Sequence, residues 1–186
     1  MSFYLAALLL HILGSFGICS ALAIEWVVLH NLKRVRVVES AREWVNVYSG
    51  LRWLGGISLA ALLIPGFYMA SIAWREAAWI SVALGSVFLL ALIGATLAGI
   101  RINKLKGALS TRSGALPPEL VAQARHPLLT LSLHLRTAII ASAVALMTFK
   151  PSLANSLLIL LSGTIIGLSS GMMAGSFFRP KIVNVT

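Results

Sequence analysis

Acidic residues and cysteine are scarce in this chain. Only five of its 186 residues are Asp or Glu, and Cys19 is the single cysteine. One cysteine excludes an intramolecular disulfide and a thiolate metal site made by one chain. No serine–histidine–acid set, paired carboxylates, phosphate loop or zinc motif is present, and general acid–base chemistry is poorly supplied. We therefore predict a protein that is not an enzyme.

Charge of either sign is also sparse. Charged residues make up 11% of the chain and hydrophobic residues 59%, against roughly 25% and 45–50% in soluble domains. The apolar residues form long blocks, which is typical of an integral membrane protein. The net charge of +10 comes from Lys and Arg between these blocks, where such residues orient the chain and meet anionic lipids. This placement argues against a nucleic-acid partner.

Five apolar blocks are long enough to cross a bilayer, which needs about 20 residues of helix. They cover residues 3–29, 51–72, 80–100, 128–149 and 153–178. The sequence thus predicts an all-α, polytopic transmembrane bundle that forms one integral membrane domain, residues 1–186. The first block lacks a basic residue before it and is interpreted as a retained helix, although Ala21-Leu22-Ala23 leaves a cleaved leader as an alternative.

Two polar connectors separate the blocks. In residues 33–48 apolar side chains recur at three- and four-residue spacing, which predicts an amphipathic interfacial helix on the cytoplasmic side, or a connector packed on the bundle. Residues 101–126 are predicted to be a cytoplasmic loop with a short helix after Pro117-Pro118. A tight hairpin is expected at residues 73–78, and the Pro65-Gly66 pair should bend the second span.

The basic residues are distributed unevenly between the two sides. The two long connectors, the C-terminal tail and the nearby Arg52 and Arg136 hold thirteen Lys and Arg, whereas the short hairpins hold only Arg75 and Lys150. The positive-inside rule therefore predicts an external N-terminus and a cytoplasmic C-terminus.

Three charged side chains fall within predicted spans: Glu25, Arg52 and Arg136. An isolated charge in lipid is costly, so one hypothesis pairs Glu25 with Arg136 or Arg52. The alternative is that all three reach the headgroups by snorkelling.

The last span carries a glycine ladder, with one glycine every four residues at Gly163, Gly167, Gly171 and Gly175. These positions share one side of a helix, and small residues let helix backbones approach closely in a bilayer. We expect this face to pack on the first, second or third span of the same chain. The alternative is a symmetric homo-oligomer.

Two histidines are candidate cofactor ligands, His11 and His134. A b-type haem needs two imidazoles at matching depth, and these two lie at different depths. His11 with Met69, Met147 or the Met172-Met173 pair offers soft ligands suited to copper(I). Neither set has the expected geometry in full, so no cofactor is predicted, and haem or copper stays an alternative.

Two stretches look familiar, L-L-L-H-I-L-G-S-F-G (residues 8–17) and L-R-T-A-I-I-A-S-A-V-A-L-M-T-F-K-P (residues 135–151). They resemble helices of small bacterial inner-membrane proteins of unknown function that are distantly related to CopD-like bundles. The resemblance implies a multi-pass protein of the bacterial inner membrane. CopD-like relatives would imply a histidine-bearing bundle that handles copper or haem, and only His11 fits that pattern.

The favoured function is a non-enzymatic scaffold or accessory subunit that depends on a membrane-protein partner. The runner-up is a small transporter or channel that acts as a homo-oligomer, for which a water-lined cavity among the first, second and fourth spans would count. A haem- or copper-binding protein is the third hypothesis.

Overall fold

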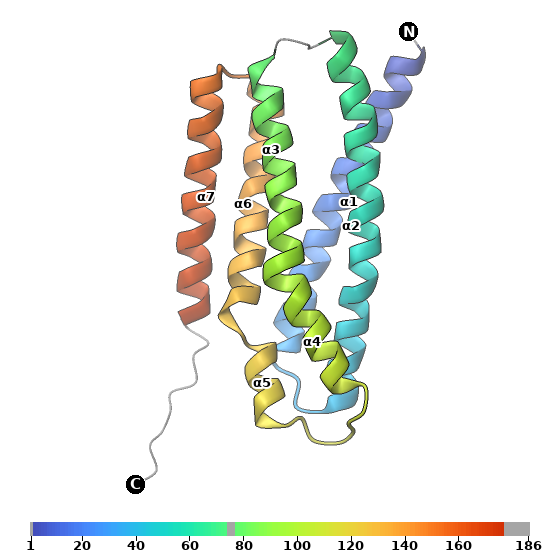
Figure 1. Ribbon diagram of the computed structural model, residues 1–186, viewed down its shortest axis with the longest axis vertical. Helices are drawn as coiled ribbons and strands as arrows, with labels where there is room; N and C mark the ends of the chain where they lie inside the picture. Colours follow the sequence, from blue (N-terminus) through green and yellow to red (C-terminus); the bar gives the residue numbers. More distant parts are fainter. Residues whose placement is uncertain (1, 74–76, 177–186) are drawn as a thin grey trace.

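A computed structural model of the chain describes residues 2–73 and 77–176 (Figure 1). These residues form seven α-helices and one π-helical turn: α1 (Ser2–Leu32), α2 (Val38–Ala73), α3 (Ala78–Ile93), η1 (Gly94–Gly99), α4 (Ile100–Leu109), α5 (Pro118–Ala124), α6 (Pro127–Phe149) and α7 (Leu153–Ser176). The central residues of the predicted hairpin, 74–76, lie outside the described residues. So do residues 177–186, which hold the end of the fifth predicted span and the basic tail.

Five stretches among the described residues have the length and hydropathy of membrane spans. They are Phe3–Leu32, Val38–Ala73, Ala78–Leu109, Pro118–Phe149 and Leu153–Gly175. The all-helical, five-span prediction is confirmed at this level. The chain is a multi-pass membrane protein by the composition and length of these helices.

The first connector is packed on the bundle, which was the alternative to a surface helix. In place of a separate surface helix at residues 33–48, α2 begins at Val38 and runs without a break through the second span. Its apolar face (Val38, Ala41, Val45 and Tyr48) is buried inside the protein. An apolar helical face can be covered by protein as well as by lipid, and here neighbouring helices cover it.

Residues 101–126 are likewise mostly helical. The third span continues through η1 into α4, and α5 begins at Pro118, which suits a first helical turn because proline lacks the N–H that would be unpaired there. An isolated antiparallel β-bridge joins Val37 to Ala115. It fixes the α1–α2 connector to the segment before α5.

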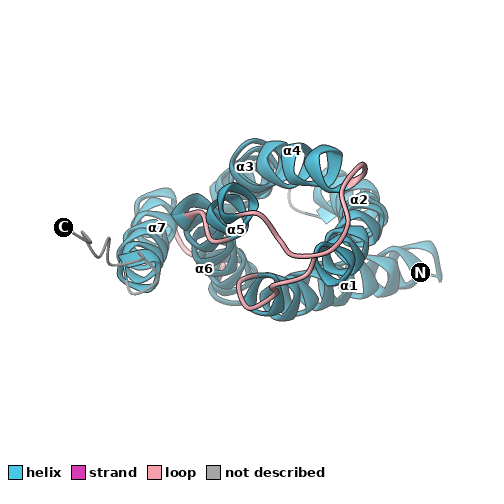
Figure 2. Ribbon diagram, turned by 90° about the horizontal axis from the view of Figure 1, so that it is seen from below, coloured by secondary structure: helices cyan, strands magenta, loops and turns pink. Residues whose placement is uncertain are grey.

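The helices form two wings. α1 packs along the length of α2, and α7 packs along α6, which also contacts α3. We call these the α1–α2 wing and the α3–α6–α7 wing. The largest buried apolar cluster joins the wings at one end through α1, α2, α4, α5 and α6, and Figure 2 shows these helices arranged around a ring at that end. Two smaller clusters lie within the α3–α6–α7 wing.

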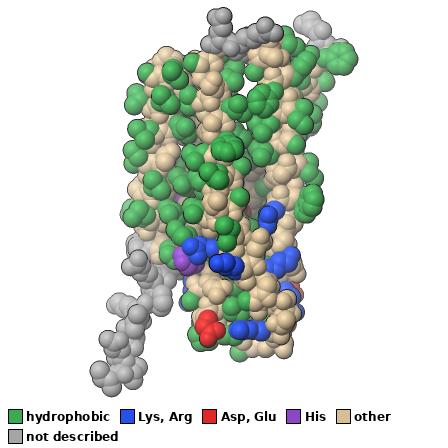
Figure 3. All heavy atoms as spheres, in the orientation of Figure 1, with side chains coloured by type: hydrophobic (Ala, Val, Ile, Leu, Met, Phe, Trp, Pro, Cys, Tyr) green, Lys and Arg blue, Asp and Glu red, His purple; other side chains and the backbone are tan. Residues whose placement is uncertain are grey.

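Charge is concentrated at the end where the wings are joined. Figure 3 shows Lys and Arg side chains gathered at the lower end of the bundle, below a broad apolar zone. We call this the basic end; it comprises residues 33–37, α4 and α5. α1 begins at the opposite end, and α7 runs from that opposite end toward the basic end (Figure 1).

Candidate functional site

The α1–α2 wing is held together by close backbone contact at two glycines. A Cβ atom built on Gly14 would lie 2.6 Å from the Leu62 nitrogen, and one built on Gly17 would lie 2.1 Å from the Ser58 hydroxyl. A side chain at Gly14 would require movement of the α2 backbone, and one at Gly17 would require movement of the Ser58 side chain. Sequence reasoning missed this contact, although the small-residue spacing of Gly14 and Gly17 on a single helix was a signal for it.

The glycine ladder of α7 packs within the chain, but on α6. A Cβ on Gly167 would lie 2.9 Å from the Leu135 Cα, and one on Gly171 would lie 3.0 Å from the Leu131 Cα. The expectation of an intramolecular contact agrees with this geometry. The expected partner does not, because α6 is the fourth span rather than the first, second or third. The short α6–α7 connection makes these two helices antiparallel neighbours, which brings the ladder onto α6.

An apolar crevice separates the two wings away from the basic end. It has a volume of about 620 Å³ and is lined by α1, α2, α3 and α6. Its polar groups are few and include His11, Ser15 and Lys150. Exposed side chains such as Phe16 and Phe67 contribute to its walls, so the crevice is open to its surroundings.

His11 lines the crevice and contacts α2 near Pro65. Its Nδ1 lies 2.8 Å from the Leu62 carbonyl oxygen. A carbonyl only accepts hydrogen bonds, so Nδ1 carries the proton. Pro65 follows one turn later and has no N–H, which interrupts the hydrogen-bond ladder of α2 in this region. The carbonyl that loses its helical partner is that of Ala61, so His11 bonds to α2 beside the weakened position.

Replacing His11 with Leu should lower the free energy of unfolding by about 1 kcal/mol, because the Leu62 carbonyl loses a donor in an apolar setting. Unfolding in mixed detergent micelles measures this change. His30→Leu is the control, since His30 is exposed at the other end of α1. Equal stability of the two variants would show that the His11 contact contributes nothing.

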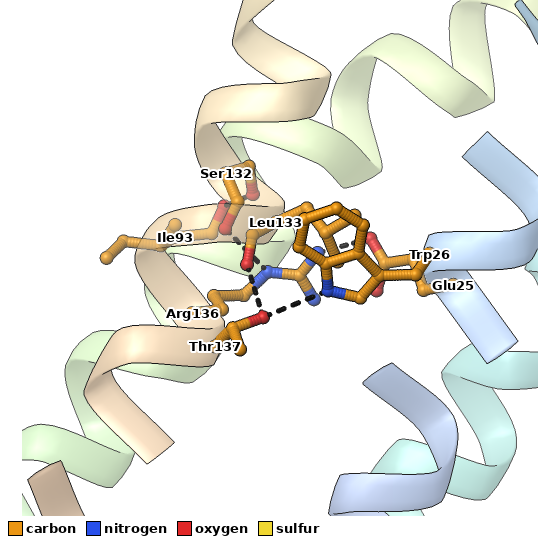
Figure 4. A network of polar contacts seen from close by, with 7 residues as sticks. All are labelled: Glu25, Trp26, Ile93, Ser132, Leu133, Arg136 and Thr137. Carbon is orange, nitrogen blue, oxygen red and sulfur yellow. Dashed lines mark hydrogen bonds and ion pairs between the residues drawn. The ribbon is translucent and has the colours of Figure 1, made fainter. Parts of the chain in front are cut away.

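A buried ion pair connects the wings on the basic-end side of the crevice. Arg136 on α6 donates from Nη2 to Glu25 on α1, and from Nε to the Ser132 carbonyl at 3.3 Å. Both charged side chains are buried, with relative exposures of 8% for Arg136 and 5% for Glu25. Figure 4 shows the guanidinium extending from α6 toward the carboxylate on α1. The pair satisfies two charges that would be costly if isolated in lipid.

The backbone beside the pair is adapted to the arginine. A Cβ on Gly94 would lie 3.3 Å from Arg136 Nη1, so a side chain there would crowd the guanidinium. Gly94 opens the π-helical turn η1, and such turns frequently occur at functional sites. No sequence pattern predicts the π turn, since its residues are typical of an ordinary apolar helix.

A second polar contact links the same two helices. The Trp26 Nε1 donates to the Thr137 hydroxyl at 3.2 Å, and that hydroxyl donates to the Leu133 carbonyl at 2.9 Å (Figure 4). Arg52, the other arginine considered for Glu25, donates instead to Asn103 on α4 at 3.1 Å. Of the two arginines that the sequence offered, the structure places Arg136 against Glu25.

The two candidate histidines lie in different surroundings. His11 lines the crevice, whereas the Nδ1 of His134 lies 3.2 Å from the Ser170 hydroxyl of α7. The His134 ring also contacts Trp26, with ring centroids 4.7 Å apart. The structure does not bring His11 and His134 into one site. Among the described residues, no three His, Cys, Asp or Glu side chains form a group that could hold a metal ion.

The crevice and the Glu25–Arg136 pair together define the candidate site. The crevice is apolar with isolated polar groups at its walls, and the described charges nearest the membrane interior are neutralised by one another. Comparison with protein-family models, curated proteins and solved structures finds no match for this chain. The CopD-like resemblance stays a prediction.

Proposed function

We propose that this protein is a non-enzymatic accessory protein of the bacterial inner membrane that binds an apolar or amphipathic membrane molecule in the crevice. A ligand of this class would be a lipid or a lipid-like molecule with an apolar body and one polar group. On this proposal the protein holds its ligand for, or presents it to, a membrane-protein partner.

The crevice is the observation that supports this proposal best. Its volume of about 620 Å³ falls within the roughly 300–1,000 Å³ of small-molecule sites. Such sites combine apolar walls with a few polar groups that orient the ligand. Here Ser15 and Lys150 are among the few polar residues of the lining, while most of the wall is apolar.

The proposed orientation places the basic end in the cytoplasm and the start of α1 outside. Lys and Arg side chains gather at the basic end (Figure 3), and cytoplasmic segments of membrane proteins carry this excess. The crevice would then lie in the outer half of the membrane. Ligands would enter it from the lipid phase or from the external face.

Filling the crevice should displace the ligand. We expect Ala70→Phe to reduce co-purifying lipid-like adducts at least about tenfold, because an aromatic ring on α2 takes the space of ligand atoms in a site whose affinity rests on apolar contact. Native mass spectrometry from mild detergent measures the adducts. Ala154→Phe is the matched control, because Ala154 is an exposed residue of α7 away from the crevice. Equal adduct levels in both variants would contradict the proposal.

Copper binding is the second candidate. His11, Cys19, Met69 and Met147 all line the crevice, and soft sulfur ligands with imidazole suit copper(I). A purified sample that carries copper in place of an organic adduct would favour this candidate. The channel hypothesis has less support, because the crevice is apolar and the glycine ladder packs within the chain.

A further inference from the structure

Five basic side chains converge on a second, smaller cleft at the basic end. This basic cleft has a volume of about 270 Å³ and is lined by His30, Lys33, Arg34, Arg36 and Arg125. They come from the end of α1, the α1–α2 connector and the end of α5. The lining includes no carboxylate, so its charges repel one another.

Several hydrogen bonds hold the backbone around the cleft in place. Arg125 donates from Nε to the Lys33 carbonyl at 2.9 Å, and Lys33 donates to the Thr130 hydroxyl at 2.6 Å. The Arg36 carbonyl accepts from the Leu116 N–H at 2.8 Å. These bonds join α1, α5 and α6 around the cleft. The backbone that carries the basic side chains is therefore positioned by the fold.

The acidic residues nearest in sequence are occupied elsewhere. Glu39 accepts from the Gly114 N–H at 3.0 Å, and Glu119 lies 3.9 Å from Arg112. Among the described residues, no carboxylate forms an ion pair with Arg34, Arg36 or Arg125. A cleft lined by these basic side chains favours an anion as its ligand.

We propose that the basic cleft binds a phosphate group, carried by an anionic phospholipid or by a soluble phosphate compound. Arginine guanidinium groups match phosphate oxygens in two-pronged hydrogen bonds. A neighbouring cavity of about 300 Å³ shares Arg36 and Arg125 and adds apolar walls from Val35, Leu116 and Val121, which suit the non-phosphate part of a ligand. The cleft lies at the basic end and the crevice lies away from it. Phosphate binding in the cleft therefore does not depend on a ligand in the crevice.

One residue of the cleft, Lys33, is partly buried. Burial lowers the pKa of its ammonium group below the ordinary value, because the charged form loses hydration. A bound phosphate would favour the charged form again. This effect adds to the geometric argument, which stands on the converging side chains.

The test uses the full chain and two variant pairs of equal charge. Arg34→Gln/Arg36→Gln removes two exposed charges from the cleft, and Lys104→Gln/Lys106→Gln removes two exposed charges from α4 outside it. One arm compares retention of phosphatidylglycerol with phosphatidylcholine by native mass spectrometry. The other titrates the protein with inorganic pyrophosphate in a calorimeter.

We expect the cleft pair to weaken binding at least about tenfold and the α4 pair to change it little, since two charge-assisted hydrogen bonds are lost only in the first. Selective retention of phosphatidylglycerol identifies a lipid source. Pyrophosphate binding with the same dependence, without lipid selectivity, identifies a soluble source. Equal losses in the two pairs, or binding of neither probe, would overturn the proposal.

Discussion

Glu25→Gln and Arg136→Met should each lower the free energy of unfolding by about 3–5 kcal/mol, because each leaves one buried charge without its partner. The loss follows from the burial of both side chains and from their position on different wings. Unfolding in mixed detergent micelles, with helix content as the signal, measures this loss. Arg52→Met is the matched control, since Arg52 is exposed and bonds only to Asn103 among the described residues.

The double variant Glu25→Gln/Arg136→Met distinguishes the energy of the interaction between the two charges from the contribution of each side chain alone. Removing both charges should recover much of the stability, since replacing a whole buried pair is often nearly neutral. The coupling energy from the four proteins gives the strength of the interaction. Single variants no less stable than Arg52→Met would show that the two charges reach water by themselves, as the snorkelling alternative holds.

Leucine at Gly14 or Gly167 should also destabilise the fold. The first atom of a new side chain would lie 2.6 Å from the Leu62 nitrogen in one case and 2.9 Å from the Leu135 Cα in the other. Backbone atoms cannot avoid the new side chain by a change of rotamer, so the two helices must move apart. Overpacking costs roughly 1–3 kcal/mol or more, and these contacts run along whole helices. We expect low yields of folded protein from both variants.

Gly85→Leu provides the control for this experiment. Nothing lies within 4 Å of a Cβ at Gly85, so a side chain there meets open space. Folded yield and melting temperature of Gly85→Leu should match the unmodified protein, as measured by size-exclusion chromatography and thermal aggregation. If Gly167→Leu matched it as well, close packing of α7 on α6 would not contribute to stability.

Hydropathy predicted the spans well because the length of an apolar block is a direct physical constraint in a bilayer. It left the form of the first connector undecided for a related reason. The face that contains Val38 and Tyr48 has the same pattern whether it meets lipid or protein, and here it meets protein. The pattern identified a helical face but not what that face contacts.

The partner of the glycine ladder could not be read from the sequence either. A row of small residues allows close approach by any helix, so Gly167 alone does not select α6 over α2. The pairing of Glu25 with Arg136 was easier to predict, because few charges lie within the spans and an unpaired charge there is costly. The crevice had no sequence signal at all, since it results from how two wings meet.

The most direct measurement of ligand binding uses Cys19, which lines the crevice and is the only cysteine of the chain. A benzophenone attached to this thiol in native membranes should, on illumination, capture one class of lipid-like molecule that mass spectrometry identifies. Ala70→Phe should abolish that capture, and Ala154→Phe should leave it unchanged. A random sample of bulk lipids, captured equally in all three proteins, would contradict a ligand site in the crevice.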